Sequence, residues 1–263
     1  MRIKLTIEYD GGGFVGWQRQ SLPGANNRSV QGELERALKR LLGRPVSLAG
    51  AGRTDAGVHA VGQVASFEAE LGIPVERLAY ALNNCLPGDI RVVGLAEAEP
   101  DFHARFSAKT KEYRYFFLKN GEKPDSFLGQ YAWFPPYKLD WKFMQEGAAL
   151  FIGEHNFRSF CAKSMVVQNY VRVVQEAAVI CCQKPDVPRH LQGLAEAGEL
   201  CAFVVRGNGF IYKMVRLMTG ALVRLGAGKL SLLDIESGLN RELAQPLAPA
   251  APPHGLYLWR IDY

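Results

Sequence analysis

The sequence lacks several features that would assign it to a particular class of protein. Its five cysteines show no C-x-x-C spacing, which argues against a disulfide framework and against a structural zinc site. Its five histidines form no H-x-x-x-H pair, so no metal is predicted. No run of eighteen apolar residues occurs, and the N-terminal stretch alternates charged and apolar residues, unlike the apolar segment of a signal peptide. We therefore expect a cytoplasmic protein that holds no metal and does not cross a membrane.

Nucleotide-binding motifs are missing or incomplete. Gly11, Gly13 and Gly16 match G-x-G-x-x-G, but a dinucleotide site also needs a helix that opens at these glycines. The next segment, residues 17–27, contains a proline and a glycine and cannot supply that helix. The phosphate-loop pattern G-x-x-x-x-G-K-[ST] is absent. We therefore expect no nucleotide cofactor.

The composition is that of a globular protein with a modest basic excess. The 263 residues are 48% hydrophobic and 22% charged, which suits one large domain or two of ordinary size. A net charge of +5 permits a polyanionic partner without requiring one. Residues 101–119 combine five basic residues with interleaved phenylalanines and tyrosines, a composition suited to phosphates and stacked bases. An ordinary strand with basic residues on its wet face would look the same.

Periodicity predicts two successive sets of helices and strands. In the first set we expect strands at residues 2–10, 46–51, 62–70 and 89–98, and helices at 30–42 and 75–85. In the second we expect strands at 110–119, 170–182, 199–207 and 255–263, helices at 140–151, 210–226 and 230–240, and loops at 183–198 and 243–255.

This order favours an α+β fold built from two similar α/β halves of ferredoxin-like or RRM-like type. We expect the halves to be residues 1–104 and 105–263. No flexible linker separates them in the sequence. We therefore expect them to share one continuous, mainly antiparallel sheet with a central cleft.

The stretch "AGAGRTDAGVHA", residues 49–60, places one carboxylate, Asp55, among small residues and two positions after Arg53. A turn residue that caps backbone amides would give the same pattern. The small residues would let a large planar ligand approach the backbone, and the lack of a second acid argues against two-carboxylate glycosidases and protease dyads. Asp55 is therefore a candidate nucleophile, or a base held ionised by a cation.

The same loop carries a family resemblance. "GRTDAGVHA" resembles the catalytic loop of the tRNA pseudouridine synthase A family, and "YDGGGFVGWQRQ", "SVQGELERAL", "LPGDI", "DFHARFSAKTKEYRY", "GNGFIYKMVR" and "GLYLWRIDY" match that family's blocks in order. The resemblance runs from Lys4 to Tyr263 and implies the pseudouridine synthase fold. It implies isomerisation of uridine to pseudouridine at positions 38–40 of the tRNA anticodon stem-loop, without a cofactor. Residues 21–28 are a few residues longer than the family's connection.

The resemblance also implies the site residues. It implies that Asp55 attacks, by adding to the uracil or the ribose or by taking a ribose proton, and that Arg216 pairs with Asp55. It also implies that Tyr113 stacks on the uracil and helps to remove the proton from C5. Arg53 resembles the residue that fills the space left by the flipped base. The remaining candidates for contacts with RNA are Thr54, His59, Gln63, Arg105, Lys109 and Lys111. The family further implies a homodimer that holds a tRNA across both subunits.

Simpler interpretations remain open at this stage. Tyr113 would also suit cross-strand packing, and Arg216 would also suit the solvated face of an amphipathic helix. A non-catalytic tRNA-binding or chaperone protein would keep the basic and aromatic segments without needing Asp55 and Arg216. A hydrolase that attacks a glycosidic bond through one aspartate would release free uracil, whereas an isomerase releases none.

Overall fold

The computed structural model describes residues 1–20, 28–70, 72, 74–119, 127–162, 168–184, 186–241, 243 and 245–263. The chain forms two compact units, Met1–Lys109 with Tyr257–Tyr263, and Thr110–Leu256. The sequence had placed the boundary at 104/105 and the closing strand in the second half. That strand belongs to the first unit, where it pairs with a neighbouring strand. Of the longer connection at 21–28, only Arg28 lies within the described residues.

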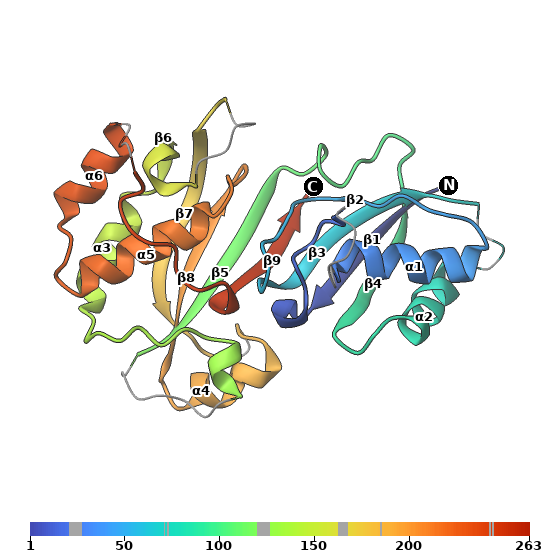
Figure 1. The fold of residues 1–263 in the computed structure, drawn as a ribbon, viewed down its shortest axis with the longest axis horizontal. Coiled ribbons are helices and arrows are strands. Elements are labelled where there is room, and N and C mark those ends of the chain that lie inside the picture. The colour runs from blue at the N-terminus through green and yellow to red at the C-terminus, as the bar shows by residue number, and fades with distance from the viewer. Residues whose placement is uncertain are drawn as a thin grey trace. The chain divides into compact units, whose positions relative to one another are not determined.

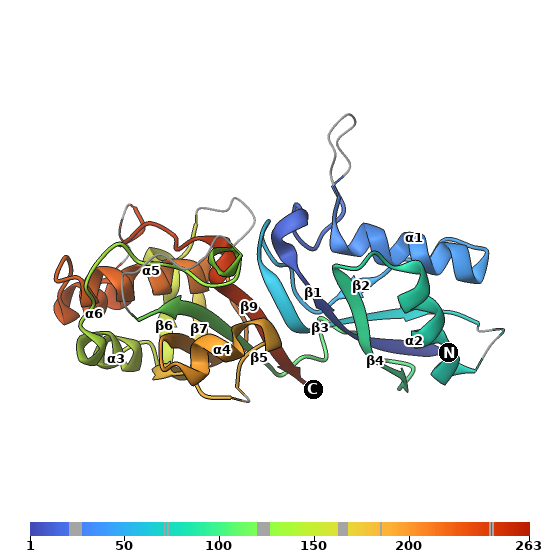
Figure 2. The same cartoon turned by 90° about the horizontal axis from the view of Figure 1, so that it is seen from below.

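The first unit is a sheet with two helices on one face (Figures 1 and 2). Its strand order is β4-β1-β3-β9, with β2 paired to β3. β1 is antiparallel to both β3 and β4, whereas β9 is parallel to β3. The strands are β1 Arg2–Tyr9, β2 Ala49–Gly50, β3 His59–Glu68, β4 Ile90–Ala98 and β9 Leu256–Asp262, and the helices are α1 Val30–Leu42 and α2 Val75–Cys85.

Local signals account for the elements of this unit. Alternate residues of β1 are buried, as the strand pattern predicts. The Ser29 side chain accepts a hydrogen bond from the Gly32 amide at the start of α1, and Gly43 ends that helix in the left-handed region. Each leucine that α1 and α2 bury contributes about 2 kcal/mol. The predicted strand at 46–51 is shorter, however, and the one predicted at 62–70 begins earlier, at His59.

The second unit has the strand order β5-β8-β7-β6, and each neighbouring pair is antiparallel. α3 packs against β7 and α5, and α6 packs against β6 and α3 (Figure 1). The α+β class with mainly antiparallel strands is therefore confirmed. The strands are β5 Thr110–Leu118, β6 Gly153–Asn156, β7 Val171–Cys181 and β8 Leu200–Gly207, and the helices are α3 Trp141–Ala149, α4 Gln192–Glu196, α5 Met214–Gly226 and α6 Leu232–Asn240.

Three predictions for the second unit need correction. The helix predicted at 210–226 begins at Met214, because Lys213 adopts a φ of 60° and the residues before it are not helical. The segment predicted as a loop at 183–198 contains the short helix α4, which buries Ala195. The Pro-rich connection at 243–255 ends in one turn of 3-10 helix, Pro253–Gly255.

No helix among the described residues has both the length and the apolar character needed to cross a membrane.

Candidate active site

Asp55 lies in the loop between β2 and β3 of the first unit and is half-buried. Its carbonyl accepts the Val58 amide at 3.2 Å and closes a turn in which Gly57 has a φ of 77°. The Gly57 amide donates to the Phe14 carbonyl at 3.4 Å. The loop is thereby fastened to the glycine-rich segment that follows β1.

Gly16 brings that segment against the backbone of the loop. Its φ is 107°, and a Cβ atom there would lie 2.5 Å from the carbonyl oxygen of Thr54 and 3.1 Å from the carbonyl carbon of Asp55. The Trp17 amide donates to the same Thr54 oxygen at 3.1 Å. Gly11–Gly13 form a single 3-10 turn. The glycines at 11–16 therefore allow two backbone segments to pack closely.

Three buried polar side chains lie beneath the loop. The Tyr9 hydroxyl is 2.8 Å from Thr54 Oγ1, and Gln63 Nε2 donates to the Gly52 carbonyl at 3.0 Å and to the Tyr9 oxygen at 3.5 Å. Tyr9 is 5% exposed, Thr54 7% and Gln63 0%. Burial raises the pKa of Tyr9 to about 12, although the hydrogen bonds with Thr54 and Gln63 oppose that rise. The structure thus places Thr54 and Gln63 in the interior, where they hold the loop.

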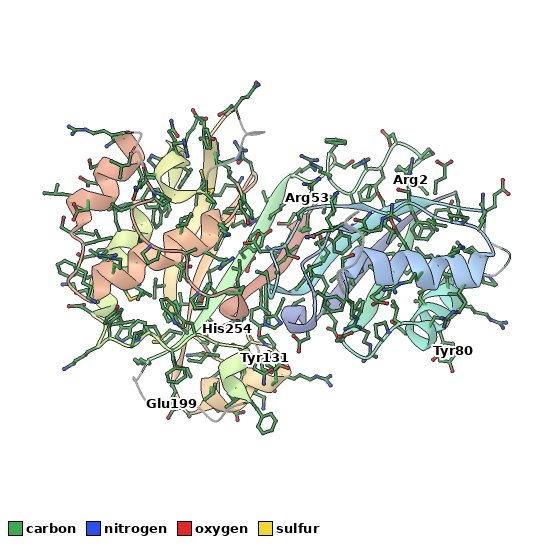
Figure 3. The ribbon with its side chains drawn as sticks, in the orientation of Figure 1. Arg2, Arg53, Tyr80, Tyr131, Glu199 and His254 are labelled. Carbon is green, nitrogen blue, oxygen red and sulfur yellow. The ribbon has the colours of Figure 1, made fainter. Side chains whose placement is uncertain are left out.

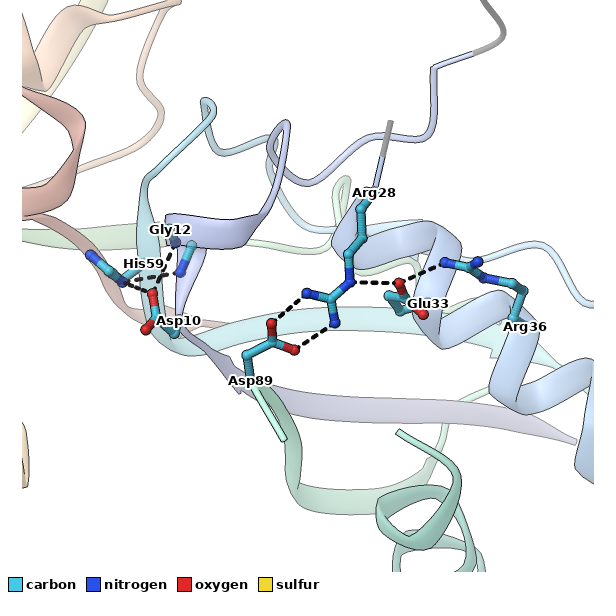
Figure 4. Close-up of polar contacts among 8 residues, drawn as sticks. Asp10, Gly12, Arg28, Glu33, Arg36, His59 and Asp89 are labelled. Carbon is cyan, nitrogen blue, oxygen red and sulfur yellow. Dashed lines mark hydrogen bonds and ion pairs between the residues drawn. The ribbon is translucent and has the colours of Figure 1, made fainter. Parts of the chain in front are cut away.

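His59 is also buried and joins the start of β3 to the end of β1 (Figure 4). Its Nδ1 accepts the Gly11 amide at 3.0 Å and lies 3.2 Å from Asp10 Oδ1, which accepts the Gly12 amide at 2.9 Å. The imidazole stacks on the ring of Tyr257 with 4.7 Å between centroids. This candidate for a contact with RNA therefore packs inside the first unit.

An ion-pair group fixes the other side of the glycine-rich segment (Figure 4). The Arg28 guanidinium donates to both oxygens of Asp89 at 2.5 and 2.8 Å and to Glu33 at 2.8 Å, and Arg36 contacts the same Glu33 oxygen at 2.7 Å. The hydrogen bonds to Asp89 are the main cause of a raised Arg28 pKa, although burial opposes the rise. The Arg28 carbon Cζ lies 4.4 Å from the centroid of Phe14. Sequence reasoning missed this group, because no pattern links residues so far apart.

Three of the basic candidates have a largely accessible position. Arg53 is exposed on the Asp55 loop (Figure 3), and Arg105 and Lys109 are exposed near the end of the first unit. Beside Arg105, Phe106 is 76% exposed, and the guanidinium lies 5.6 Å from its ring centroid. His103 Nδ1 accepts the Arg105 amide at 3.1 Å and shapes this turn. Such a turn offers both a cation and an aromatic face to a nucleic acid.

Tyr113 lies on β5 of the second unit, opposite Val205 of β8. It is 8% exposed and meets Phe210 edge to face, with 5.2 Å between ring centroids. Phe210 belongs to the irregular segment between β8 and α5. Lys111, the remaining basic candidate, is half-buried on the same strand.

Arg216 occupies the first turn of α5 in the second unit and is half-buried. Its Nε donates to the Ala251 carbonyl at 2.8 Å, and its own carbonyl accepts the Ala251 amide at 2.9 Å. Burial raises the pKa of Tyr115 well above its ordinary value, and the positive charge of Arg216 opposes that rise. Arg216 is therefore anchored, and a freely solvated basic face does not describe it.

Among the residues that the structure describes, no three histidine, cysteine or acidic side chains gather as a metal site requires.

Comparison with known proteins gives one consistent family. The sequence model of the family described as tRNA pseudouridine synthase matches residues 5–107 and 148–263. A protein of Bacillus subtilis is 43% identical over 265 residues, with 100% of this chain and 99% of the relative covered. A protein of Moorella thermoacetica is 42% identical over 261 residues, with 99% of each chain covered. Both relatives are named tRNA pseudouridine synthase A.

Proposed function

Since this chain belongs to the tRNA pseudouridine synthase family and is an isomerase that converts uridine to pseudouridine in tRNA, we propose that its targets are the uridines at positions 38, 39 and 40 of the anticodon stem-loop. The reaction breaks the bond between N1 and C1′, turns the uracil, rejoins it through C5 and releases the C5 proton, while N1 takes up a proton. Electrons are conserved, and no group is added to the product. The chemistry therefore depends on a nucleophile or general base and on groups that hold the uracil.

We propose that Asp55 is the group that attacks. The observation that carries this proposal is the construction of its loop, in which Thr54 is held through its hydroxyl and its carbonyl while Asp55 beside it is half-buried. Glycine and alanine around Asp55 leave room for a flipped nucleotide. A lone carboxylate fits a reaction in which one group both adds and leaves.

Tyr113 and Arg216 complete the proposed site. A tyrosine that is held edge to face by Phe210 has a fixed ring on which a uracil can stack, and its hydroxyl can assist removal of the C5 proton. Arg216 is anchored through Nε to the Ala251 carbonyl, and its planar guanidinium has the geometry to pair with a carboxylate. In the proposed mechanism this arginine pairs with Asp55 during catalysis.

Two variants separate these roles. Tyr113→Phe should retain tRNA binding but slow release of the C5 proton. Arg216→Lys should lower kcat about tenfold or more, because lysine lacks the fork, whereas the exposed Arg241→Lys of the same unit should not. Unchanged turnover of Arg216→Lys would remove it from the mechanism.

Binding of tRNA is proposed to rest mainly on exposed basic groups. Arg53, Arg105 and Lys109 are exposed and can reach phosphates, and Lys111 on β5 can add to them. Thr54, His59 and Gln63 are proposed to act on RNA only indirectly, through the loop that they hold. Recognition by shape and backbone suits three neighbouring targets in different sequence contexts. Affinity should therefore fall steeply as salt rises.

The protein is also proposed to be a cytoplasmic homodimer that holds one tRNA across both subunits. Its resemblance to the family is the support for this assignment. Light scattering at submicromolar concentration tests it, and a purely monomeric species would contradict it.

The decisive experiment measures tritium release from unmodified tRNA labelled at uracil C5. Wild-type protein and the control Asp101→Asn, which loses an exposed acid of the same unit, should release tritium, and Asp55→Asn should not. Transcripts that keep a single uridine at position 38, 39 or 40 test the assignment of targets. Filter binding that persists without release from any variant or transcript would favour a non-catalytic tRNA-binding protein, and release of free uracil would favour a hydrolase.

A further inference from the structure

We infer that the hydroxyl of Tyr9 is a positioning group for catalysis, which sets the place of Asp55 through its hydrogen bond to Thr54. This inference rests on the proposed role of Asp55. Tyr9 itself has no contact with the reacting atoms in this scheme.

The contact joins the end of β1 to the residue immediately before Asp55. Tyr9 is the last residue of β1, and its hydroxyl lies 2.8 Å from Thr54 Oγ1 with both side chains buried. The two residues are 45 positions apart in the sequence. A rigid strand of the sheet therefore fixes one atom of the loop, independently of the loop's own turn.

One hydrogen bond in this group has a defined direction. Gln63 Nε2 can only donate, so at 3.5 Å the Tyr9 oxygen accepts from it. The Tyr9 hydroxyl carries its proton at neutral pH, as any tyrosine does, and burial raises its pKa further, to about 12. That proton can then be donated to Thr54. Gln63 also holds the Gly52 carbonyl at 3.0 Å, so one buried amide serves both the tyrosine and the loop.

Thr54 is held on three sides. Its hydroxyl is hydrogen-bonded to the Tyr9 hydroxyl, and its carbonyl oxygen accepts the Trp17 amide at 3.1 Å. Gly16 lies against the same carbonyl. Two of these contacts act on the backbone and one on the side chain. Removing the side-chain contact should let Thr54 rotate and should move the carboxylate that follows it, while leaving the surface that meets tRNA unchanged.

The test uses substitutions that keep shape and remove one hydroxyl. Tyr9→Phe and Thr54→Val should each lower kcat about tenfold or more, because a displacement of about 1 Å at a reacting group is already costly. The KM for tRNA should stay within about twofold of the wild-type value, since the exposed basic residues are untouched. Thr54→Ser should restore most of the rate, because it returns the hydroxyl.

Two further measurements separate positioning from general stability. Tyr263→Phe is a matched control, since it removes a hydroxyl that donates to the Ala104 carbonyl at 2.8 Å in the same unit, and its kcat should not change. The double variant of Tyr9→Phe with Thr54→Val should be no slower than the slower single variant, because both remove one shared contact.

Several outcomes would overturn the inference. Wild-type kcat in Thr54→Val, no rescue by Thr54→Ser, or losses that multiply in the double variant would each show that this contact does not position Asp55. Turnover by Asp55→Asn would instead refute the proposed function. If Asp55→Asn is inactive while Tyr9→Phe is fully active, only the positioning role fails.

Discussion

Replacing Gly16 with alanine would put a methyl group where the backbone of the Asp55 loop already lies. The new Cβ would stand 2.5 Å from the Thr54 carbonyl oxygen, so that oxygen would have to retreat by about 0.9 Å to reach ordinary contact at 3.4 Å. Because this oxygen belongs to the backbone, no rotation of a side chain can relieve the close contact. A φ of 107° adds about 1 to 3 kcal/mol for any residue other than glycine. We expect Gly16→Ala to lower the free energy of unfolding by about 3 kcal/mol.

The same displacement should reach the chemistry, because Asp55 follows Thr54 directly. A shift of nearly 1 Å predicts a loss of about a hundredfold in kcat. Single-turnover tritium release from labelled tRNA measures that loss, and urea unfolding measures the stability. Both assays are run where the variant is still folded.

Gly43→Ala is the matched control for this prediction. Gly43 also has a positive φ, 68°, but a Cβ atom there would meet nothing within 4 Å. Its alanine variant should lose about 1 kcal/mol for the left-handed conformation and keep its kcat. The reasoning is refuted if Gly16→Ala is no less stable than Gly43→Ala and its kcat lies within threefold of that control.

Three further predictions concern an ion pair, two adjacent cysteines and stability at alkaline pH. Asp89→Asn should lower the free energy of unfolding by about 1 kcal/mol in urea, because the two-bond pair with Arg28 is only partly exposed. At pH 7.5, mass spectrometry should find iodoacetamide on exposed Cys181 well before buried Cys182, whose pKa burial raises to about 12. Stability should fall as pH rises from about 9 towards 12, because the unfolded chain then loses protons that folded Tyr9 and Cys182 retain. A urea midpoint that is constant over this range would contradict the last prediction.

The parts of the fold that local signals govern could be predicted from the sequence. The helix at 30–42 has its bounds as expected, because Ser29 caps one end and Gly43 can adopt the left-handed conformation at the other. The start of α5 could not be predicted, since apolar spacing continues back to Phe210 while the chain turns at Lys213. No feature of the sequence indicates that this lysine adopts a positive φ.

The candidate site, like the fold, could be predicted only in part from the sequence. Asp55 could be singled out because a lone acid in a run of small residues is visible in the sequence. The contacts that hold the Asp55 loop could not be predicted, because Tyr9 and Thr54 meet only after strands from distant parts of the chain have paired. Burial of Gln63 depends on which face of the sheet its side chain occupies, and burial of Thr54 depends on how its loop packs against β1. In the sequence, each of these polar residues looks equally suited to contact with RNA.

The closing strand β9 has a consequence for the order in which this protein can fold. It pairs with β3 through His59 and Ala60, next to the Asp55 loop, yet nearly two hundred residues separate the partners. The first unit is therefore discontinuous along the chain, and a ribosome must translate the whole second unit before residues 257–263 can join the sheet. Closing so long a loop is slow compared with local helix formation. The nascent first unit therefore lacks its last strand until residues 257–263 have been translated, and the stacking of His59 on Tyr257 cannot form before then.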